Sequence, residues 1–218
     1  MATRTRRKRT RRVRRQSDLP LLLLFVSIAA VIVASFVLRN GWRGHDESAA
    51  RSLSMQEARE ENASIPFVTE QGSAKAFRFH GSSAAREQAV QCLATAAVYE
   101  AGDDEPGQKA VMQVVLNRMS RPGYPKTVCG VVYQGASRIT GCQFSFSCDG
   151  SQSRRPERAG WSTARTAARR ALSGRVFAAV GSATHYHADW IVPYWIHSLD
   201  KIAQVHSHIF YRPRQHAA

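Results

Sequence analysis

Hydrophobic residues recur three or four positions apart in three segments of the chain, which is the spacing of one face of an α-helix. The first segment, residues 85–102, ends at Gly102, a residue that commonly follows a helix. The second, residues 106–119, starts with Pro106 at a position suited to a first helical turn. The third, residues 162–174, is expected to be capped by Ser162 and to stop at Gly174. A shorter helix is expected within residues 128–135.

Other segments have the character of β-strands. In residues 142–148, Phe144 and Phe146 alternate with serines, a period of two that predicts a strand. Residues 183–195 and 207–212 are rich in aromatic and β-branched side chains and also predict strands or extended segments. The pattern as a whole therefore predicts an α+β fold that is mainly helical and carries a small β element.

The N-terminal region has a different pattern. Residues 19–38 form a run of twenty residues without a formal charge, about the length needed to cross a ~30 Å hydrocarbon core. Nine basic residues and one acidic residue precede this run and hold about half of the net charge of +15. By the positive-inside rule they keep the N-terminus in the cytoplasm, so we expect a single transmembrane helix with the rest of the chain on the other side.

A cleaved signal peptide is the alternative, although its apolar core is usually only ~7–15 residues long, and the paired arginines also fit a twin-arginine signal. Export follows in each case. We therefore divide the chain into a basic cytoplasmic tail (1–18), a transmembrane anchor (19–38), a polar linker or stalk (39–84) and a folded domain (85–213). Within the linker, only a short helix around Ser54 to Glu61 is expected.

The chain has four cysteines, and no two of them form a C-x-x-C pair, which argues against a zinc ribbon or a thioredoxin-like site. In an exported domain an even number of cysteines is compatible with one or two disulfides. Cys142 and Cys148 are close enough in sequence to form one if the chain turns between them. Cys92 lies in a helical pattern and also fits a buried thiol, so the pairing of Cys92, Cys129, Cys142 and Cys148 stays open.

Glu100 is the most informative acidic residue. It follows Leu93, Ala96 and Ala97 at helical spacing, which puts its carboxyl group at the end of the apolar face. A carboxyl group that is partly removed from water has a raised pKa and keeps its proton near neutral pH, as a general acid must. The alternative is that Glu100 lies at a frayed helix end and is solvated.

Three further acidic residues follow Gly102, and we interpret Asp103, Asp104 and Glu105 as turn acids that cap the next helix and favour its N-terminal dipole. His185 and His187 alternate, so on a strand both would face the same side, and with Asp189 a zinc site can be imagined. Because no H-E-x-x-H motif occurs, we favour histidines that line a substrate groove or form hydrogen bonds with their neighbours, and we expect no metal and no cofactor. The absence of a G-x-S-x-G motif likewise argues against a serine nucleophile.

Four separated motifs agree in order with one known family: "CLATAAVYEAG", "GQKAVMQVVLNRMSRPGYPKTVCGVVYQG", "GCQFSFSCDG" and "ATHYHADWIVPYW" with "HSHIFYR". Over about residues 88–212 the chain resembles the cell wall hydrolase family, which includes the catalytic domains of spore-cortex-lytic enzymes. The resemblance implies a lysozyme-like domain that cleaves peptidoglycan, with Glu100 as the catalytic residue. The acidic turn and the cysteines are closer to members from Gram-negative bacteria, which implies an inner-membrane anchor and a periplasmic domain.

Glycoside hydrolysis usually takes two carboxyl groups, but a lytic transglycosylase needs only one. The 6-hydroxyl group of the muramic acid attacks its own anomeric carbon, so a single glutamate can act first as acid and then as base. We therefore predict that Glu100 does both when the MurNAc–GlcNAc strand is cut. Candidates for orienting the glycan or stabilising the oxocarbenium-like state are Gln143, Ser145, Tyr186 and His187.

Three other functions compete with this one. The first is a hydrolysing muramidase with Asp103 or Asp104 as the second carboxyl group. The second is an N-acetylmuramoyl-L-alanine amidase, which would need the zinc site. The third is a non-catalytic peptidoglycan-binding module. We expect peptidoglycan and, through residues 19–38, the membrane as partners, and no nucleic acid, because the basic tail directly adjoins the apolar run.

Overall fold

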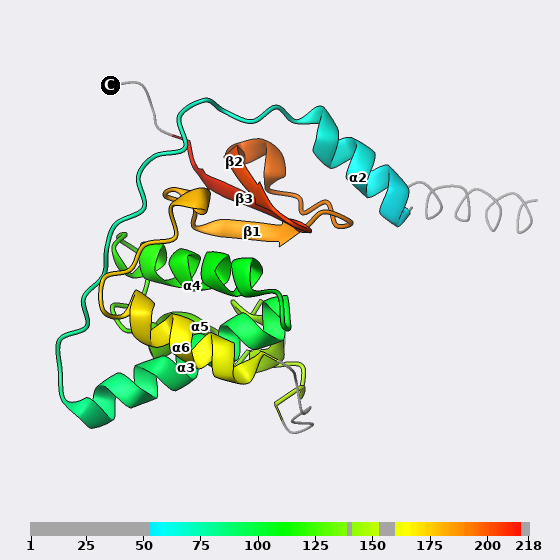
Figure 1. Cartoon of the computed structure of the whole chain (residues 1–218). Coiled ribbons are helices and arrows are strands. Elements are labelled where there is room, and N and C mark those ends of the chain that lie inside the picture. The colour runs from blue at the N-terminus through cyan, green and yellow to red at the C-terminus, as the bar shows by residue number, and fades with distance from the viewer. Residues whose placement is uncertain (1–52, 139–140, 153–159, 215–218) are drawn as a thin grey trace, which may run out of the picture. The chain divides into compact units, whose positions relative to one another are not determined.

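Five α-helices and a three-stranded sheet make up the part of the chain that this computed structural model describes, residues 53–138, 141–152 and 160–214 (Figure 1). The described residues belong to one compact unit, which starts at Leu53. The predicted cytoplasmic tail, the predicted anchor and the first part of the linker lie outside the described residues. Among the described residues, no helix has the length and apolar character that a membrane span requires.

Helix α3 (Ser83–Ala101) carries the predicted Glu100 in its last turn. Its N-cap is Ser82, whose hydroxyl group accepts from the backbone N–H of Ala85, so the helix starts two residues before the predicted boundary. Gly102 ends it with φ of 57°, and its N–H donates to the carbonyl of Val98. The buried amide of Gln108 then donates to the carbonyl of Gly102 at 2.6 Å, which fixes the turn after Glu100.

Helix α4 (Glu105–Met119) begins with proline in its first turn, as predicted, and lies between the sheet on one side and helices α3 and α6 on the other (Figure 1). Val111, Met112 and Val115 belong to the core with α3 and α6, whereas Ala110 and Val114 belong to a second core with the sheet. This helix is apolar on two faces because it separates two cores, and it thereby sets the distance between α3 and the strands.

The short helix α5 (Val128–Val132) was predicted. Helix α6 (Trp161–Ala171) packs the small side chains of Ala164 and Ala168 against α3. The predicted cap Ser162 is wrong, because the helix begins at Trp161 and its N-cap is Gly160. A Cβ atom at Gly160 would lie 2.9 Å from the carbonyl oxygen of Gly102 and 2.7 Å from the Gln108 amide. The close approach of α6 to the end of α3 therefore requires glycine there.

The sheet is antiparallel with the order β1-β3-β2. Strands β1 (His185–Ala188) and β3 (His208–Pro213) were predicted, whereas β2 (Leu199–Val205) was not. The strand predicted for residues 142–148 is wrong: these residues form a turn with the 3₁₀-helix η1 (Ser145–Ser147). Phe144 and Phe146 alternate because the turn points both rings into the same core, not because the backbone is extended. The mainly helical α+β class is confirmed.

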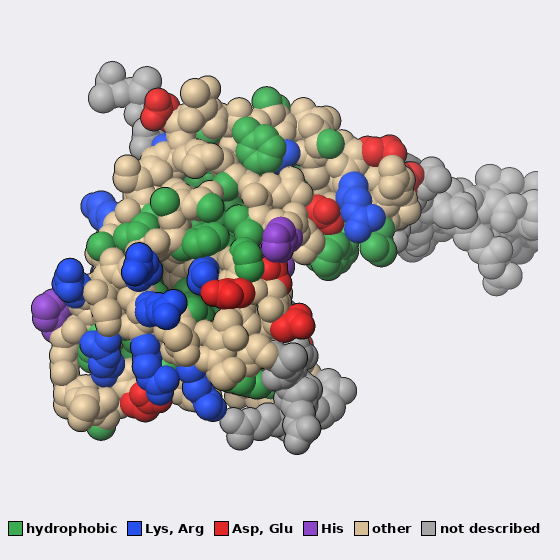
Figure 2. Space-filling model, viewed as in Figure 1, with side chains coloured by type: hydrophobic (Ala, Val, Ile, Leu, Met, Phe, Trp, Pro, Cys, Tyr) green, Lys and Arg blue, Asp and Glu red, His purple; other side chains and the backbone are tan. Residues whose placement is uncertain are grey.

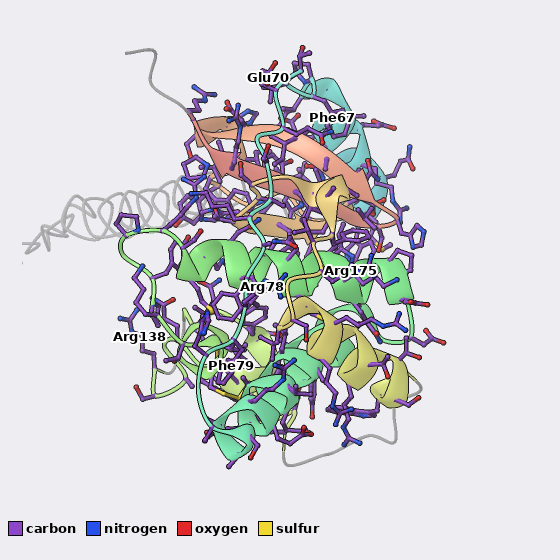
Figure 3. All side chains as sticks on the ribbon, turned by 60° about the vertical axis from the view of Figure 1, so that its left-hand side comes forward. Phe67, Glu70, Arg78, Phe79, Arg138 and Arg175 are labelled. Atoms are coloured by element: carbon purple, nitrogen blue, oxygen red, sulfur yellow. A yellow bond between two sulfur atoms is a disulfide. The ribbon has the colours of Figure 1, made fainter. Side chains whose placement is uncertain are left out.

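Residues 53–82, which the sequence analysis assigned to the linker, lie along the folded domain (Figure 3). The helix expected around Ser54 to Glu61 is α2 (Met55–Ser64), capped by Ser54 in a reciprocal capping box. After it, the backbone N–H of Val68 donates to Lys201 in β2, and that of Phe79 donates to Leu172 after α6. The structure thus differs from the predicted boundary at residue 85: the compact unit starts at Leu53.

Two disulfides tie elements of the domain together, and they use all four cysteines. Cys92 in α3 pairs with Cys129 in α5, so the reading of Cys92 as a free buried thiol is wrong. Cys142 pairs with Cys148 across the turn that contains η1. One disulfide therefore joins two helices of the core, and the other closes a short surface loop.

Candidate active site

A cavity of about 470 Å³ lies between the end of α3, helix α4, the η1 turn and strands β1 and β3. All five residues that the sequence singled out for the site line it: Glu100, Gln143, Ser145, Tyr186 and His187. The other lining residues come from the same elements and from the segment after β1: Tyr99, Ala101, Asp104, Arg118, Ala188, Trp190, Ile191, Ser207 and His208. The tertiary structure thus brings together groups from five separated segments.

The Glu100 side chain is half-buried, and the partial loss of water around its carboxyl group raises its pKa. A hydrogen bond from the Tyr186 hydroxyl group and the positive charge of Arg118 act in the opposite direction, whereas the negative charge of Asp149 raises the pKa further. Because burial is the largest of these effects, the structure agrees with the raised pKa expected from the apolar helix face. The reading of Glu100 as a fully solvated group at a frayed helix end is not what the structure shows.

Tyr186 stands in the middle of β1, directly across from Phe210 in β3, and its ring contacts Phe210 and the edge of His208. Burial raises the pKa of its hydroxyl group well above the ordinary value, with Glu100 as the next cause. The hydroxyl group therefore stays protonated and acts as a hydrogen-bond donor to Glu100. This is a more specific relation than the general substrate-orienting role predicted for Tyr186.

Arg118 is a residue of the cavity that the sequence analysis missed. Its side chain is only 3% exposed, and its Nε donates to the carbonyl of Thr184 at 2.6 Å. In the amide orientation that satisfies both groups, the oxygen of Gln143 accepts from the two terminal guanidinium nitrogens at 3.1 and 3.2 Å. The guanidinium group also lies over the ring of Phe144. Gln143 is thus held by Arg118. This role was not recognisable from the sequence, because an arginine near the end of a helix is usually exposed to solvent.

The η1 turn presents two side chains with different surroundings. Ser145 is exposed at the rim of the cavity, whereas Phe146 is buried and stacks on the ring of Tyr99 with 4.6 Å between centroids. Tyr99 precedes Glu100 in α3, and its hydroxyl group donates to the carbonyl of Ser151. The stacked pair therefore connects the turn to the helix end that carries Glu100.

His187 lines the cavity, but both of its ring nitrogens have partners within the protein. Its Nδ1 donates to the carbonyl of Ala188 at 2.9 Å, so Nε2 accepts from the Tyr211 hydroxyl group at 3.0 Å. Desolvation lowers the pKa of His187. Desolvation also lowers the pKa of His185, to about 4. Both rings contact Trp195, on the same side of the strand as predicted, and within the described residues no three His, Cys, Asp or Glu side chains form a metal-binding group.

The three turn acids have separate roles. Asp104 occupies the N-cap position of α4 without a side-chain cap, so the predicted capping by this carboxylate is wrong. Its Oδ2 contacts the ring of His206 at 2.9 Å instead. Glu105 pairs with Lys109 at 2.7 Å, and Asp103 is exposed outside the cavity. Asp104 is therefore the second carboxyl group, besides Glu100, that lines the cavity within the described residues.

His208 is the other cavity residue that the sequence analysis did not assign. Its imidazole donates to the backbone carbonyl of Glu100, while its buried Nδ1 has no partner among the described residues. Desolvation is the main cause that lowers its pKa, so the ring is neutral near pH 7. It fixes the backbone at Glu100 from the side of β3, whereas Gln108 holds the carbonyl of Gly102, two residues later, from α4.

Comparison with known proteins places this geometry in a family. A sequence model described as cell wall hydrolase matches residues 102–211, just over half of the chain. The chain belongs to the cell wall hydrolase family. The family predicted from the sequence motifs, and with it the class of enzyme, is confirmed.

A spore cortex-lytic enzyme of Halalkalibacterium halodurans is 34% identical over 123 residues, 56% of this chain. The chain spans about a third of the length of that relative. Among solved structures, the catalytic domain of the Bacillus cereus SleB protein is 28% identical to this chain and has a TM-score of 0.47. The match covers 62% of this chain and 95% of the SleB domain. The catalytic domain of the germination-specific lytic transglycosylase SleB from Bacillus anthracis has the same identity and TM-score and is covered to 99%.

In this cell wall hydrolase the matched region begins at Gly102, two residues after Glu100. It contains the cavity residues from α4, the η1 turn and the strands, whereas Tyr99, Glu100 and Ala101 precede it. Chemically, the cavity offers one carboxyl group with a raised pKa beside a neutral phenol donor and a buried guanidinium group. Such a group can donate a proton to a leaving oxygen at neutral pH and then hold the resulting negative charge.

Proposed function

We propose that this chain is a lytic transglycosylase that cuts the MurNAc–GlcNAc strands of peptidoglycan with Glu100 as acid and base. The observation that carries the proposal is the raised pKa of one half-buried carboxyl group, that of Glu100, in a cavity of about 470 Å³. The other carboxyl group that lines the cavity among the described residues, Asp104, is engaged with His206. A lysozyme-like arrangement, with the acid at a helix end beside a small sheet, is part of the proposal.

The reaction begins with proton transfer from the Glu100 carboxyl group to the oxygen of the glycosidic bond. The bond from the MurNAc anomeric carbon to that oxygen breaks, which releases the GlcNAc hydroxyl group and leaves an oxocarbenium-like sugar. The Glu100 carboxylate then takes the proton of the MurNAc 6-hydroxyl group, while the oxygen of that hydroxyl group bonds to the anomeric carbon. The product is a 1,6-anhydro sugar, no water is consumed, and Glu100 ends the cycle protonated.

The surrounding residues suit the two protonation states. Burial favours the protonated form that starts the reaction, and the Tyr186 hydroxyl group and the charge of Arg118 stabilise the carboxylate that follows. Ser145, exposed at the rim, and Gln143, held by Arg118, are proposed to contact the glycan. We propose that His187 supports the wall of the cavity, because both of its ring nitrogens are used within the protein.

The hydrolysing muramidase is the second candidate, because Asp104 lines the same cavity as Glu100. Mass spectrometry of the products of purified peptidoglycan incubated with the full-length chain separates the functions. Anhydro-muropeptides support the transglycosylase, reducing ends indicate a hydrolase, free stem peptides indicate an amidase, and no cleavage indicates a binding module. Glu100→Gln should abolish cleavage, and the control Glu105→Gln, which changes an exposed acid paired with Lys109, should keep it. Cleavage that is retained in Glu100→Gln and lost in Asp104→Asn would contradict the assignment.

We also propose that residues 19–38 anchor the chain in the inner membrane and that residues 53–214 act in the periplasm. The run of uncharged residues supports the anchor, and two disulfides in the domain suit an oxidising compartment. The test is fractionation of cells that produce the full chain, followed by protease treatment of spheroplasts. The proposal requires a membrane-bound protein whose domain is digested from outside; a cytosolic or protected domain would contradict it.

A further inference from the structure

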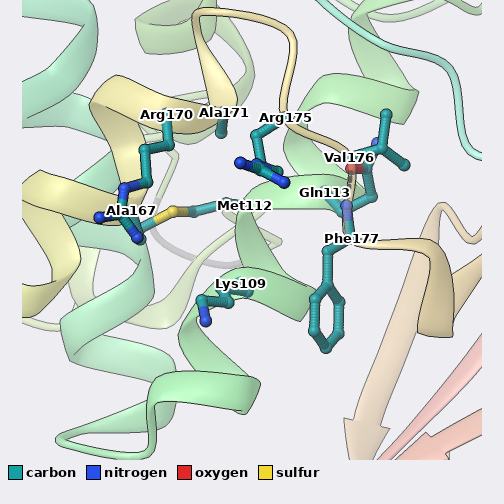
Figure 4. A pocket seen from close by; sticks show the side chains of 9 residues that line it. All are labelled: Lys109, Met112, Gln113, Ala167, Arg170, Ala171, Arg175, Val176 and Phe177. Carbon is teal, nitrogen blue, oxygen red and sulfur yellow. Dashed lines mark hydrogen bonds between the residues drawn. The ribbon is translucent and has the colours of Figure 1, made fainter.

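A second hollow, of about 350 Å³, lies between α4, α6 and the loop that follows α6 (Figure 4). The proposed reaction does not use it. Three cationic side chains border it: Lys109 from α4, Arg170 from α6 and Arg175 from the loop. We call this hollow the basic pocket; its other lining residues are Met112, Gln113, Ala167, Ala171, Val176 and Phe177.

The cations of the basic pocket are only partly neutralised. Glu105 pairs with Lys109 at 2.7 Å, and this contact, with a weaker effect of Arg170, lowers the pKa of the Glu105 carboxyl group. Within residues 53–138, 141–152 and 160–214, neither Arg170 nor Arg175 forms an ion pair with an acidic residue. Arg169, the neighbour of Arg170, differs because it pairs with Glu87 at 3.0 Å. Figure 2 shows the Lys and Arg side chains gathered over α6.

The walls of the basic pocket are held in place before any ligand binds. The Gln113 amide donates to Asn117 at 3.0 Å, and its oxygen accepts from the backbone N–H of Phe177 at 3.0 Å. The backbone N–H of Arg175 donates to the carbonyl of Arg170 at 3.0 Å. The floor is apolar, with Met112 and Ala167 from the core. A preformed pocket with an apolar floor and a cationic rim suits a small group that carries an anion.

The basic pocket also has a defined position relative to the catalytic cavity. A smaller hollow shares Lys109, Ala167 and Arg170 with it and reaches Glu105 at the start of α4. The residue before Glu105 is Asp104, which lines the catalytic cavity. The smaller hollow and the basic pocket therefore adjoin, and a polymer bound in the catalytic cavity would have to pass the start of α4 to reach the basic pocket.

We propose that the basic pocket binds carboxylate groups of the stem peptides carried by peptidoglycan, a proposal that rests on the proposed function. Arginine matches carboxylates because its planar guanidinium group can donate two parallel hydrogen bonds. The short apolar side chains of such peptides fit the floor formed by Met112 and Ala167. The pocket would then select glycan strands that still carry peptides.

The first arm of the test measures binding without cleavage. Isothermal titration of the full chain with a free stem peptide should show binding that weakens at high salt. The double variant Arg170→Gln/Arg175→Gln should bind at least about tenfold more weakly, as expected for the loss of charged hydrogen bonds. Arg169→Gln is the matched control, since it removes a paired charge from the same helix. A peptide with amidated carboxyl groups should not bind.

The second arm measures cleavage of peptide-bearing strands and of strands whose peptides have been removed. The double variant should raise KM for the first by about tenfold and leave the second unchanged. Equal effects on both, or none, overturn the proposal, as does peptide binding that the double variant retains. Binding of inorganic phosphate or of vesicles with anionic phospholipid, in place of the peptide, overturns it as well. If no glycan is cut at all, the proposed function fails, but the titration still shows whether the basic pocket binds the peptide.

Discussion

The hydroxyl group of Tyr186 in β1 donates a hydrogen bond to the carboxyl group of Glu100 in the last turn of α3. This contact joins the helical part of the domain to the sheet at the point where the proposed chemistry takes place. It partly offsets the effect of burial, because a donor to the carboxylate stabilises the charged form. The burial of Glu100 and the hydrogen bond from Tyr186 therefore set the pKa of the Glu100 carboxyl group together.

Tyr186→Phe should shift the pH dependence of glycan cleavage. Removal of the hydrogen bond raises the pKa of Glu100, so the protonated acid persists to higher pH and the alkaline limb of kcat/KM moves up. A hydrogen bond to a charged group contributes about 1.5–3 kcal/mol, which corresponds to a shift of about one to two pH units. Rates measured between acidic and alkaline pH report the shift.

The matched control for this change is Tyr194→Phe, since Tyr194 is 97% exposed and does not line the cavity. Its profile should coincide with that of the unchanged protein. An alkaline limb that moves down in Tyr186→Phe, or does not move, would show that Tyr186 does not stabilise the Glu100 carboxylate.

Glu100→Gln should increase thermal stability near neutral pH. The folded pKa of Glu100 is raised, so folding favours the protonated form; the stability that this gives is complete below the ordinary carboxyl pKa and is lost as pH rises through the raised value. Glutamine cannot ionise and avoids this loss. The melting temperature of the variant should exceed that of the unchanged protein at pH 7, and the difference should shrink below pH 4; a lower melting temperature at pH 7 would contradict the burial argument.

The two disulfides should contribute differently to stability and activity. The pair Cys92–Cys129 closes a loop with a sequence separation of 37, so replacing both by alanine should lower the free energy of unfolding by about 3–4 kcal/mol. The pair Cys142–Cys148 spans only six positions and should contribute about 2 kcal/mol. Gln143 and Ser145, which line the cavity, lie inside the smaller loop. Loss of the Cys142–Cys148 disulfide should therefore reduce the rate of cleavage more than loss of Cys92–Cys129, although it lowers the free energy of unfolding less. Urea titration and activity of the two double variants test this order.

Asn62 connects α2, the first helix of the domain, to the cavity wall. The side chain is 2% exposed, and its amide donates to the carbonyls of Asp189 and Ile191 at 2.8 and 2.9 Å. Asn62→Ala should lower the free energy of unfolding by about 1–3 kcal/mol, because two partly buried hydrogen bonds lose their donor. It should also raise KM, since Trp190 and Ile191 line the cavity.

Gln56→Ala is the control for Asn62→Ala, because Gln56 lies on the exposed side of the same helix and bonds only to Glu60. Urea titration and peptidoglycan kinetics of both variants provide the measurement. Equal stability and KM in Asn62→Ala and the unchanged protein would show that α2 does not hold the wall of the cavity.

The hydrophobic periodicity was sufficient for α3, α4 and α6, and for the position of Glu100 at the end of an apolar face. It failed where local pattern and tertiary packing diverge. Phe144 and Phe146 look like a strand because both rings enter one core, and β2 escaped notice because Asp200 and Lys201 interrupt its apolar residues. Residues 53–82 look like a linker because backbone hydrogen bonds and scattered side chains such as Val68, Phe77 and Phe79 attach them to the domain, without a sustained apolar pattern.

The sequence by itself determined the helices, the mainly helical class, the family and the candidate acid, because each depends on spacing within one segment or on motifs in order. Only the tertiary structure decided which groups surround Glu100. Tyr186 and Arg118 come from different elements, and their effect on the pKa of Glu100 depends on distance and burial, which short-range patterns do not encode. His208, from a third element, contacts the backbone of Glu100. The same holds for the basic pocket, whose cations are separated along the chain and meet only when α4 packs against α6.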